Sequence, residues 1–577
     1  MGSGDLELIF DRVGHFGRFQ IFLYVVCAFQ NTSCGIHYLA SVFMTATPHY
    51  VCKPPGNVSM VLFHQDTTLG LEDIWALFSP GQEDHIALQL QNGTIWELTG
   101  CHMYWRENAV HLEYDYHGSK HEFPCSGGYI YDWRKWESTV VTEWNLVCHQ
   151  EWLAKMIQPT FMLGVLLGAV IFGYLSDRAG RRLILRCTSI GQFFLGIAVA
   201  FTLDYYSFMV THFLLAMVAS GYLVVMFVYV TEFIGMKART WASIHVHSFF
   251  AIGIMVVALV GYLVKTWRLY QIVLSVVSAP FALCCWMLPE TPFWLLSQAR
   301  YEEAQKIVDK MAKWNRASSC TLSELLSLDH NGPADNNLPK GKKPNISDLF
   351  CDWNIAIRTL CIWLIWFTGS LGFYFFSLNS VNLGGSEYLN LFLMGAAELP
   401  AYVFVCIGMD KIGRRKVLTL SLISSAVICG VIMGIPQGYH IWSVVASMVG
   451  KFTMAAAFGL IYLYTAELYP TIVRSQAVGS GSMMCCVGSI VAPFCIYLTS
   501  VWRFLPQLLV GTVAFLSGGL TLLLPETLGK PLVTTWEEAA KLESGKLSSC
   551  RKLLHTTNNI ELEKTDVINP ETSGLCE

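Results

Sequence analysis

A charged signature occurs twice in this chain, about 235 residues apart, each time after a long apolar run. Residues 173–182 read GYLSDRAGRR, and residues 408–415 read GMDKIGRR. Two more motifs repeat in the same order, at offsets of 235 and 236 residues: the Glu232/Arg239 pair returns as Glu467/Arg474, and the Pro-Glu-Thr tripeptide ending at Thr291 returns ending at Thr527. Three motifs in one order at nearly one offset indicate two equivalent halves, an arrangement typical of membrane transporters.

Twelve apolar runs are long enough to cross a bilayer, which takes about 20 residues. They lie near 19–43, 154–175, 183–202, 207–230, 243–265, 269–288, 358–377, 389–409, 417–434, 441–465, 476–500 and 505–524. Only 14% of the residues are charged, whereas soluble domains have about a quarter. We therefore predict an all-α membrane protein of twelve transmembrane helices in two six-helix halves.

The basic residues of the short connections predict which side of the membrane each connection faces, because Lys and Arg concentrate on the cytoplasmic side. Both signature loops are rich in Arg, and the opposite connections between runs 3–4, 7–8 and 9–10 have neither Lys nor Arg. Both termini are then cytoplasmic. The expected segments are a cytoplasmic N-terminus 1–18, helix 1 at 19–43, an extracellular loop 44–153, helices 2–6 at 154–288, a cytoplasmic linker 289–357, helices 7–12 at 358–524 and a cytoplasmic tail 525–577.

The long extracellular loop has the chemistry of an oxidising compartment. Its four cysteines predict two disulfides and allow three pairings; they are Cys52, Cys101, Cys125 and Cys148. It also contains two N-glycosylation acceptors, Asn57 and Asn92, each in an Asn-x-Ser/Thr sequence.

The repeated charges predict a gating device at the cytoplasmic ends of the helices. In each half an acid and arginines of the signature loop can pair with charges at the end of helix 4 or helix 10. These contacts would hold the cytoplasmic side shut while the outside is open. The expected gating residues are Asp177, Arg178, Arg181, Glu232 and Arg239 in the first half, and Asp410, Arg414, Glu467 and Arg474 in the second.

Two charges inside apolar runs are candidates for the substrate site, because a charge at midspan costs about 2.5–3.5 kcal/mol on insertion scales. Glu398 lies in run 8 and Lys451 in run 10. Each must face a cavity or a partner; a structural ion pair inside one half is the alternative, and Lys451 could also extend to the external surface. Aromatic residues crowd run 7 and recur in runs 4 and 10, and such rings attract quaternary ammonium groups.

Other functional classes find little support in the sequence. There is no Gly-x-x-x-x-Gly-Lys-Ser/Thr loop for ATP, no Ser/His/Asp arrangement and no metal-ligand cluster. The net charge of −4 gives no reason to expect nucleic acid. We expect no enzyme activity, no metal and no resident cofactor. The expected partners are a small-molecule substrate and membrane lipid, with coupling to Na⁺ or to the membrane potential left open.

The motifs resemble those of the organic cation/anion/carnitine transporters, solute carrier family 22 of the major facilitator superfamily. The resemblance rests on the signature loop, on YTAELYPT at 464–471, on PETPFWLL at 289–296 and on the cysteine-bearing first external loop, and it covers residues 1 to about 540. The sequence VGKF at 449–452 is similar to the carnitine branch. The resemblance implies a major facilitator fold and uptake of carnitine, related zwitterions and organic cations across the plasma membrane.

The resemblance also implies which residues form the central site. Carried over by position, these are Phe227, His247, Trp366, Phe373 and Glu398, to which we add Lys451, Tyr462 and Cys486. Cys486 is a departure: cation transporters of the family have Asp at this position of helix 11, and anion and carnitine transporters usually have Arg. Either Lys451 supplies the positive charge for a carnitine carboxylate, or selectivity is looser.

We therefore predict a plasma-membrane transporter that takes up carnitine and organic cations by alternating access. The first alternative is an organic anion transporter of the same fold, which the neutral Cys486 allows and Glu398 disfavours. The second is a non-transporting membrane receptor that uses the glycosylated loop. Two intact signatures disfavour the receptor, because it would not need them.

Overall fold

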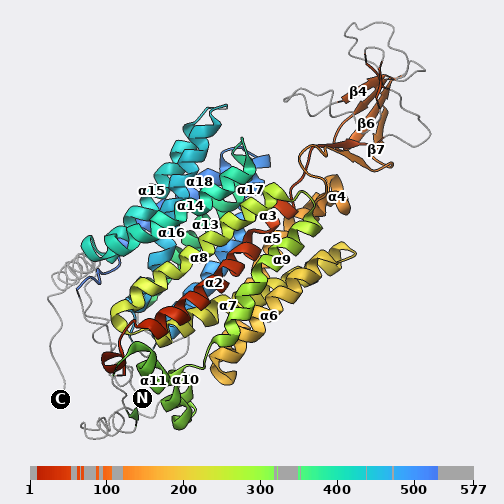
Figure 1. Ribbon diagram of the computed structural model, residues 1–577. Helices are drawn as coiled ribbons and strands as arrows, with labels where there is room; N and C mark the ends of the chain where they lie inside the picture. Colours follow the sequence, from red (N-terminus) through yellow and green to blue (C-terminus); the bar gives the residue numbers. More distant parts are fainter. Residues whose placement is uncertain are drawn as a thin grey trace, which may run out of the picture.

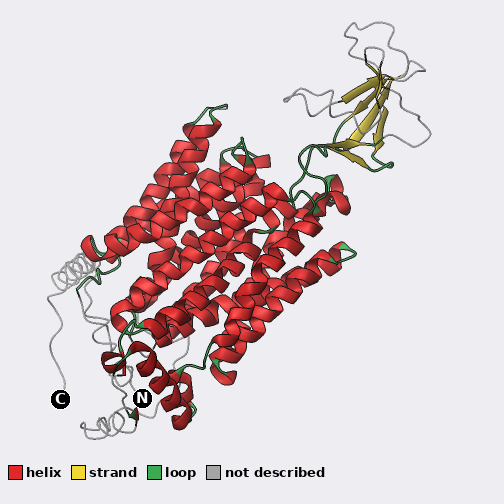
Figure 2. Cartoon of the chain, in the orientation of Figure 1, coloured by secondary structure: helices red, strands yellow, loops and turns green. Residues whose placement is uncertain are grey.

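The computed structural model describes residues 9–53, 62–64, 67–69, 86–89, 95–106, 121–317, 321–322, 349–350, 353–436, 438–470 and 473–529. Figure 2 shows a bundle of long helices with a small group of strands at one end. Asn57 and Asn92, the predicted glycosylation acceptors, lie outside the described residues, as does the tail after residue 529.

The helices fall into two sets of six that match the predicted halves. The first set is α2 (Arg18–Leu39), α5 (Glu151–Ala179), α6 (Arg181–Ala200), α7 (Tyr205–Phe233), α8 (Met236–Leu263) and α9 (Trp267–Cys284). The second set is α13 (Trp353–Leu378), α14 (Glu387–Lys411), α15 (Arg414–Gly434), α16 (His440–Leu468), α17 (Arg474–Tyr497) and α18 (Leu505–Thr521). A short helix, α3 (Ser41–Met44), extends the outer end of α2.

Among the described residues, eleven helices are long and apolar enough to cross a membrane, and α18, with 17 residues, is shorter. The predicted twelfth run reached residue 524. The difference arises because the α-helix ends at Thr521 and the chain continues in tighter turns, with the N–H groups of Leu522, Leu523 and Leu524 each bonded to the carbonyl three residues back.

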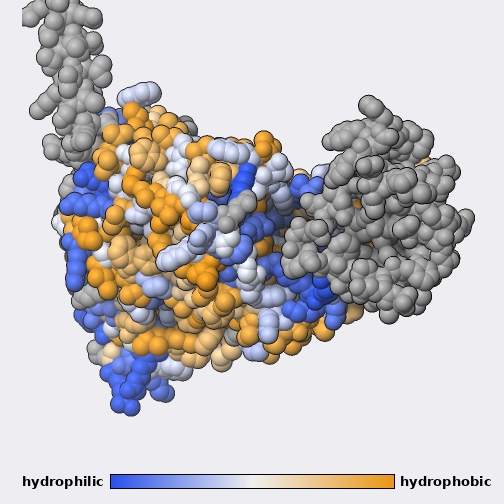
Figure 3. All heavy atoms as spheres, turned by 90° about the horizontal axis from the view of Figure 1, so that it is seen from above, coloured by the Kyte–Doolittle hydropathy of each residue, from blue (hydrophilic) through white to orange (hydrophobic). Residues whose placement is uncertain are grey.

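The outer surface of the bundle is apolar, as contact with lipid requires. Large side chains such as Phe194, Leu259, Leu283 and Val427 are more than half exposed. Figure 3, which views the molecule from above, shows hydrophobic side chains over much of the visible bundle. Exposed apolar area on this scale fits a bilayer rather than water.

The two halves use the same internal pairings. In the first half α2 packs on α8, α5 on α7 and α6 on α9; in the second half α13 packs on α17, α14 on α16 and α15 on α18. The halves meet through two symmetric contacts, α8 with α14 and α5 with α17 (Figure 1). The repeat seen in the sequence is therefore a repeat of packing.

The long loop between α2 and α5 contains the strands. Strands β4 (Ile86–Gln89), β5 (Ile95–Leu98), β6 (His102–Arg106) and β7 (His121–Pro124) form an antiparallel sheet. The two-stranded sheets are β1 (Tyr50–Cys52) with β8 (Tyr129–Tyr131), and β2 (Leu62–His64) with β3 (Thr67–Leu69). Of the three pairings that the sequence allows, the structure has Cys52–Cys125 and Cys101–Cys148.

The opposite end of the bundle has the helices that follow the first half, α10 (Pro292–Ser297) and α11 (Tyr301–Asn315) (Figure 1). The side chain of Asn315 joins α11 to the start of α2. Its Oδ1 accepts from the N–H of Phe19 at 3.0 Å, and its Nδ2 donates to the carbonyl of Val13 at 3.0 Å. Both signature loops also lie at this end of the bundle, opposite the end that carries the strands.

Candidate functional site

The first signature loop forms a compact network of charges. The guanidinium of Arg181 lies 3.0 Å from Asp177 and 3.1 Å from Glu232. Thr291 donates its hydroxyl to the other oxygen of Glu232 at 2.6 Å. The Arg181–Glu232 contact agrees with the pairing expected from the sequence.

The second signature loop repeats this network. The guanidinium of Arg414 lies 3.6 Å from Asp410 and 3.5 Å from Glu467. Thr527 donates its hydroxyl to Glu467 at 2.6 Å, as Thr291 does to Glu232. Each network is built from residues of one half, so the pairs hold together the signature-loop end of a half and do not themselves join the two halves.

The glutamate of each Pro-Glu-Thr motif caps a helix, a role that was not predicted from the sequence. Glu290 accepts from the N–H groups of Arg181 and Arg182 at 3.0 and 3.2 Å, at the first turn of α6. Glu526 accepts from the N–H of Arg414 at 2.9 Å, at the first turn of α15. A carboxylate there satisfies free N–H groups and favours the helix dipole. The exact repetition of Pro-Glu-Thr was the available signal.

The remaining expected gating residues lie at the edges of these networks. Arg178 is exposed, with its guanidinium 4.7 Å from the ring centroid of Tyr174. Arg239 donates to the carbonyl of Ile234 at 3.2 Å. Arg474 is half-buried at the start of α17, and burial lowers its pKa.

The two midspan charges meet. Nζ of Lys451 on α16 lies 2.9 Å from Oε1 of Glu398 on α14, and both side chains are fully buried. Lys451 also donates to the hydroxyl of Ser377 at 2.6 Å and to the carbonyl of Phe373 at 3.2 Å, and Tyr402 donates to Glu398 at 3.1 Å. The alternative in which Lys451 extends to the external surface is wrong, because partners on α13 and α14 bind its ammonium inside the second half.

Aromatic rings continue from this pair toward the signature-loop end of the bundle. Nζ of Lys451 lies 2.9 Å from the ring centroid of Phe373, and the Phe373 ring lies 5.6 Å from that of Phe458. Tyr462 follows, with ring centroids 5.8 Å from Phe458 and 4.3 Å from Trp366. The indole of Trp366 is fixed by its N–H bond to Thr465, at 3.0 Å.

The first half adds two rings to the same cluster. The ring of Phe227 on α7 lies 5.5 Å from that of Tyr462, and the ring of His247 on α8 lies 5.9 Å from it. Phe227, His247, Phe458 and Tyr462 are partly exposed, whereas Trp366 is fully buried. The accessible part of the cluster therefore lies between the two halves.

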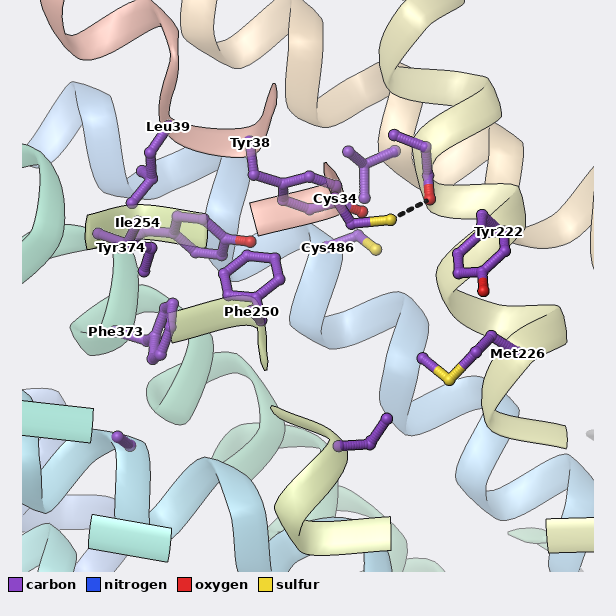
Figure 4. Packing of buried hydrophobic residues seen from close by; sticks show 14 of the residues in the cluster. Cys34, Tyr38, Leu39, Tyr222, Met226, Phe250, Ile254, Phe373, Tyr374 and Cys486 are labelled. Carbon is purple, nitrogen blue, oxygen red and sulfur yellow. Dashed lines mark hydrogen bonds between the residues drawn. The ribbon is translucent and has the colours of Figure 1, made fainter. Parts of the chain in front are cut away.

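Cys486, on α17, belongs to the buried cluster beside these rings. Figure 4 shows its sulfur near Cys34 and Tyr38 of α2. It is 6% exposed. No charge from this position of helix 11 enters the site.

All eight expected site residues therefore lie in or beside one central region. Three further residues contact this region and were not predicted as site residues: Tyr402, Ser377 and Phe458. Tyr402 lies one helical turn after Glu398, a spacing that could have indicated it. Ser377 and Phe458 gave no such signal. Among the described residues, no group of three or more His, Cys, Asp or Glu could hold a metal ion.

Comparison with known proteins identifies the family. The sequence profile described as "Sugar (and other) transporter" matches residues 116–537. Solute carrier family 22 member 16 of Bos taurus is 68% identical over 575 residues, covering 100% of both chains, and that of Homo sapiens is 67% identical over 577 residues, covering 100% of both. Organic cation/carnitine transporter 2 of Homo sapiens is 33% identical over 546 residues, covering 94% of this chain and 95% of its own.

A solved structure supports the fold. The xylose transporter XylE of E. coli, in a partially occluded inward-open conformation, aligns with a TM-score of 0.57 at 14% identity and covers 89% of this chain and 99% of its own. The predicted fold is thereby confirmed, and the receptor alternative is wrong, because the relatives are solute carriers along the whole chain. This chain belongs to solute carrier family 22, a family of membrane transporters with the major facilitator fold.

Proposed function

We propose that this protein takes up carnitine and organic cations across the plasma membrane. The observation that carries the proposal is the aromatic cluster of Phe373, Phe458, Tyr462 and Trp366 beside the Glu398–Lys451 pair. Aromatic faces attract ammonium groups without needing a counter-charge. The names of the relatives, which include an organic cation/carnitine transporter, support the same substrate class.

The charge balance of the site favours cations and zwitterions over anions. Glu398 and Lys451 neutralise each other, and Cys486 brings no charge. The ammonium of Lys451 already has an ion partner and two further acceptors, so little of its charge is left for a bulky organic anion. A zwitterion can place its ammonium on the partly exposed rings, which does not draw on the charge of Lys451.

Alternating access would carry the substrate across. The partly exposed rings lie toward the signature-loop end of α16, and contacts between the halves close the opposite end, where the ammonium of Lys155 lies 5.1 Å from the ring centroid of Tyr497. The two signature networks would keep each half rigid at its cytoplasmic end while the halves rock about the central site. No resident cofactor is needed; a gradient of substrate or Na⁺, or the membrane potential, would drive uptake.

The test is uptake by the purified full-length chain in proteoliposomes. Labelled carnitine, tetraethylammonium and an aromatic organic anion are compared, each with and without a Na⁺ gradient and with an imposed membrane potential. We expect both carnitine and tetraethylammonium to be taken up, and each to inhibit the uptake of the other. Uptake of the anion alone would overturn the proposal.

A further inference from the structure

The last part of the extracellular loop, residues 132–138, returns from the strands to the bundle, and we call it the exit segment. It begins at the paired strands β1 and β8, where the N–H of Asp132 donates to the carbonyl of His49 at 2.8 Å. Arg134 folds back onto Asp132 with an ion pair of 2.7 Å. Burial opposes ionisation of Asp132, but the hydrogen bonds and charge of Arg134 outweigh it and lower the pKa.

The exit segment is bound to the first half. Ser138 is hydrogen-bonded to the turn between α8 and α9. Its N–H donates to the carbonyl of Lys265, and its carbonyl accepts from the N–H of Trp267 at 3.1 Å. The next short helix, α4 (Val140–Glu143), reinforces this junction. Glu143 accepts from the indole N–H of Trp267 at 2.6 Å and lies 2.5 Å from the guanidinium of Arg268.

The same segment touches the second half. Nζ of Lys135 lies 2.5 Å from Oε1 of Glu387, at the first turn of α14. The next residue of α14, Tyr388, has ring contacts with Trp136 of the segment at 5.5 Å and with Phe43 of α3 at 5.0 Å. Glu387 and Tyr388 move with the second half, whereas all their partners here belong to the first.

A partly exposed cation, Lys265, also contacts the Tyr388 ring. Nζ of Lys265 lies 4.1 Å from the ring centroid of Tyr388 and 5.2 Å from that of Tyr262. Burial and the nearby charge of Lys135 lower the pKa of Lys265, against the opposite effect of Glu137 and Glu387. The ring of Tyr388 is thus enclosed by Phe43, Trp136, Tyr262 and Lys265, all from the first half.

We infer that the exit segment is the outer gate of the transporter: a strap fixed to the first half that closes the extracellular entrance by holding Glu387 and Tyr388 of the second half. The inference rests on the proposed alternating-access transport. It implies that the extracellular domain is mechanically part of the transport cycle, because β8 leads directly into the strap. Opening to the outside must break the Lys135–Glu387 pair and separate Tyr388 from the rings of Phe43 and Trp136.

The test measures outward opening separately from transport. Ile254→Cys on α8 is the reporter, because Ile254 is fully buried and faces Gly395 of α14 across the interface between the halves. Intact cells expressing this variant are labelled with a membrane-impermeant maleimide. The same labelling is repeated with Lys135→Glu, Glu387→Lys and the double exchange, and background labelling is subtracted using the chain that retains Ile254.

Each single reversal places like charges together and should raise reporter labelling at least twofold, and the double exchange should return it toward the starting value. Arg300→Glu is the matched control. Arg300 also forms an ion pair, with Glu303 three residues later in the chain, but this pair lies on the cytoplasmic side. Labelling unchanged by the single reversals, or not restored by the exchange, would overturn the gate. Labelling that behaves as expected in a chain that transports no tested substrate would instead contradict the proposed function alone.

Discussion

Lys451 places its ammonium 2.9 Å from Glu398, and neither side chain has any exposed surface. Two opposite charges brought from separate helices into the interior of one half must be a matched pair, because an unpaired charge there would be costly. The pair also lies at one end of the aromatic cluster, because the same ammonium lies over the ring of Phe373. The buried ion pair and the aromatic cluster are therefore in direct contact.

Replacing one partner of this ion pair should reduce folding more than replacing both partners. Glu398→Gln or Lys451→Met alone leaves one buried charge, which costs about 3–5 kcal/mol, and should sharply reduce the yield of folded protein. The double variant should recover much of that yield but not carnitine uptake. Monodispersity in detergent and thermal unfolding measure the first effect, and uptake measures the second. A double variant that transports carnitine normally would limit the pair to a structural role.

Tyr462 should contribute to binding of the ammonium group through its ring. Tyr462→Leu should raise the Km for tetraethylammonium by about 2- to 30-fold, which corresponds to about 0.5–2 kcal/mol, whereas Tyr462→Phe should keep most of the affinity. Phe515→Leu is the control, because Phe515 is 60% exposed on the outer face of α18. Equal Km values for the Leu and Phe variants of Tyr462 would show that the ring does not bind the cation.

Cys486 should determine how the site treats carboxylates. Cys486→Arg adds a positive charge beside Tyr38 and Tyr374, so it should raise the affinity for carnitine and lower that for tetraethylammonium. Cys486→Ala controls for loss of the thiol. Competition of both substrates for uptake gives the two affinities. If the Arg variant loses carnitine uptake but keeps that of tetraethylammonium, the carnitine carboxylate does not bind beside position 486.

Gly413 should tolerate no side chain, because its φ is +108° and an added Cβ would lie 2.6 Å from Oε2 of Glu526. Gly413→Ala should therefore displace Glu526 from the start of α15 and destabilise the second signature network by about 1–3 kcal/mol. Gly430→Ala, in the same helix, has open space around the added methyl group and should be neutral or slightly stabilising. Thermal unfolding of the purified variants separates the two.

The duplicated signature was enough to predict two halves and, in each, a pairing of loop charges with charges at the end of helix 4 or helix 10; the structure shows that Arg181 pairs with Glu232 and Arg414 with Glu467. Apolar length located the helices, because the bilayer imposes it on any spanning segment. The predicted pairs lie within each half, and they do not join one half to the other. Sequence spacing shows which charges are equivalent, but only the structure shows which arginine meets which acid.

Contacts between distant segments were decided only by the tertiary structure. Glu398 and Lys451 are 53 positions apart, and their pairing depends on how α14 and α16 are rotated about their own axes. Phe458 and Ser377 joined the site for the same reason. The strap at Lys135 meets Glu387 from a loop 252 residues away. The local sequence determines apolar length, charge and turn chemistry, whereas the packing of helices against one another selects which buried side chains face a common space.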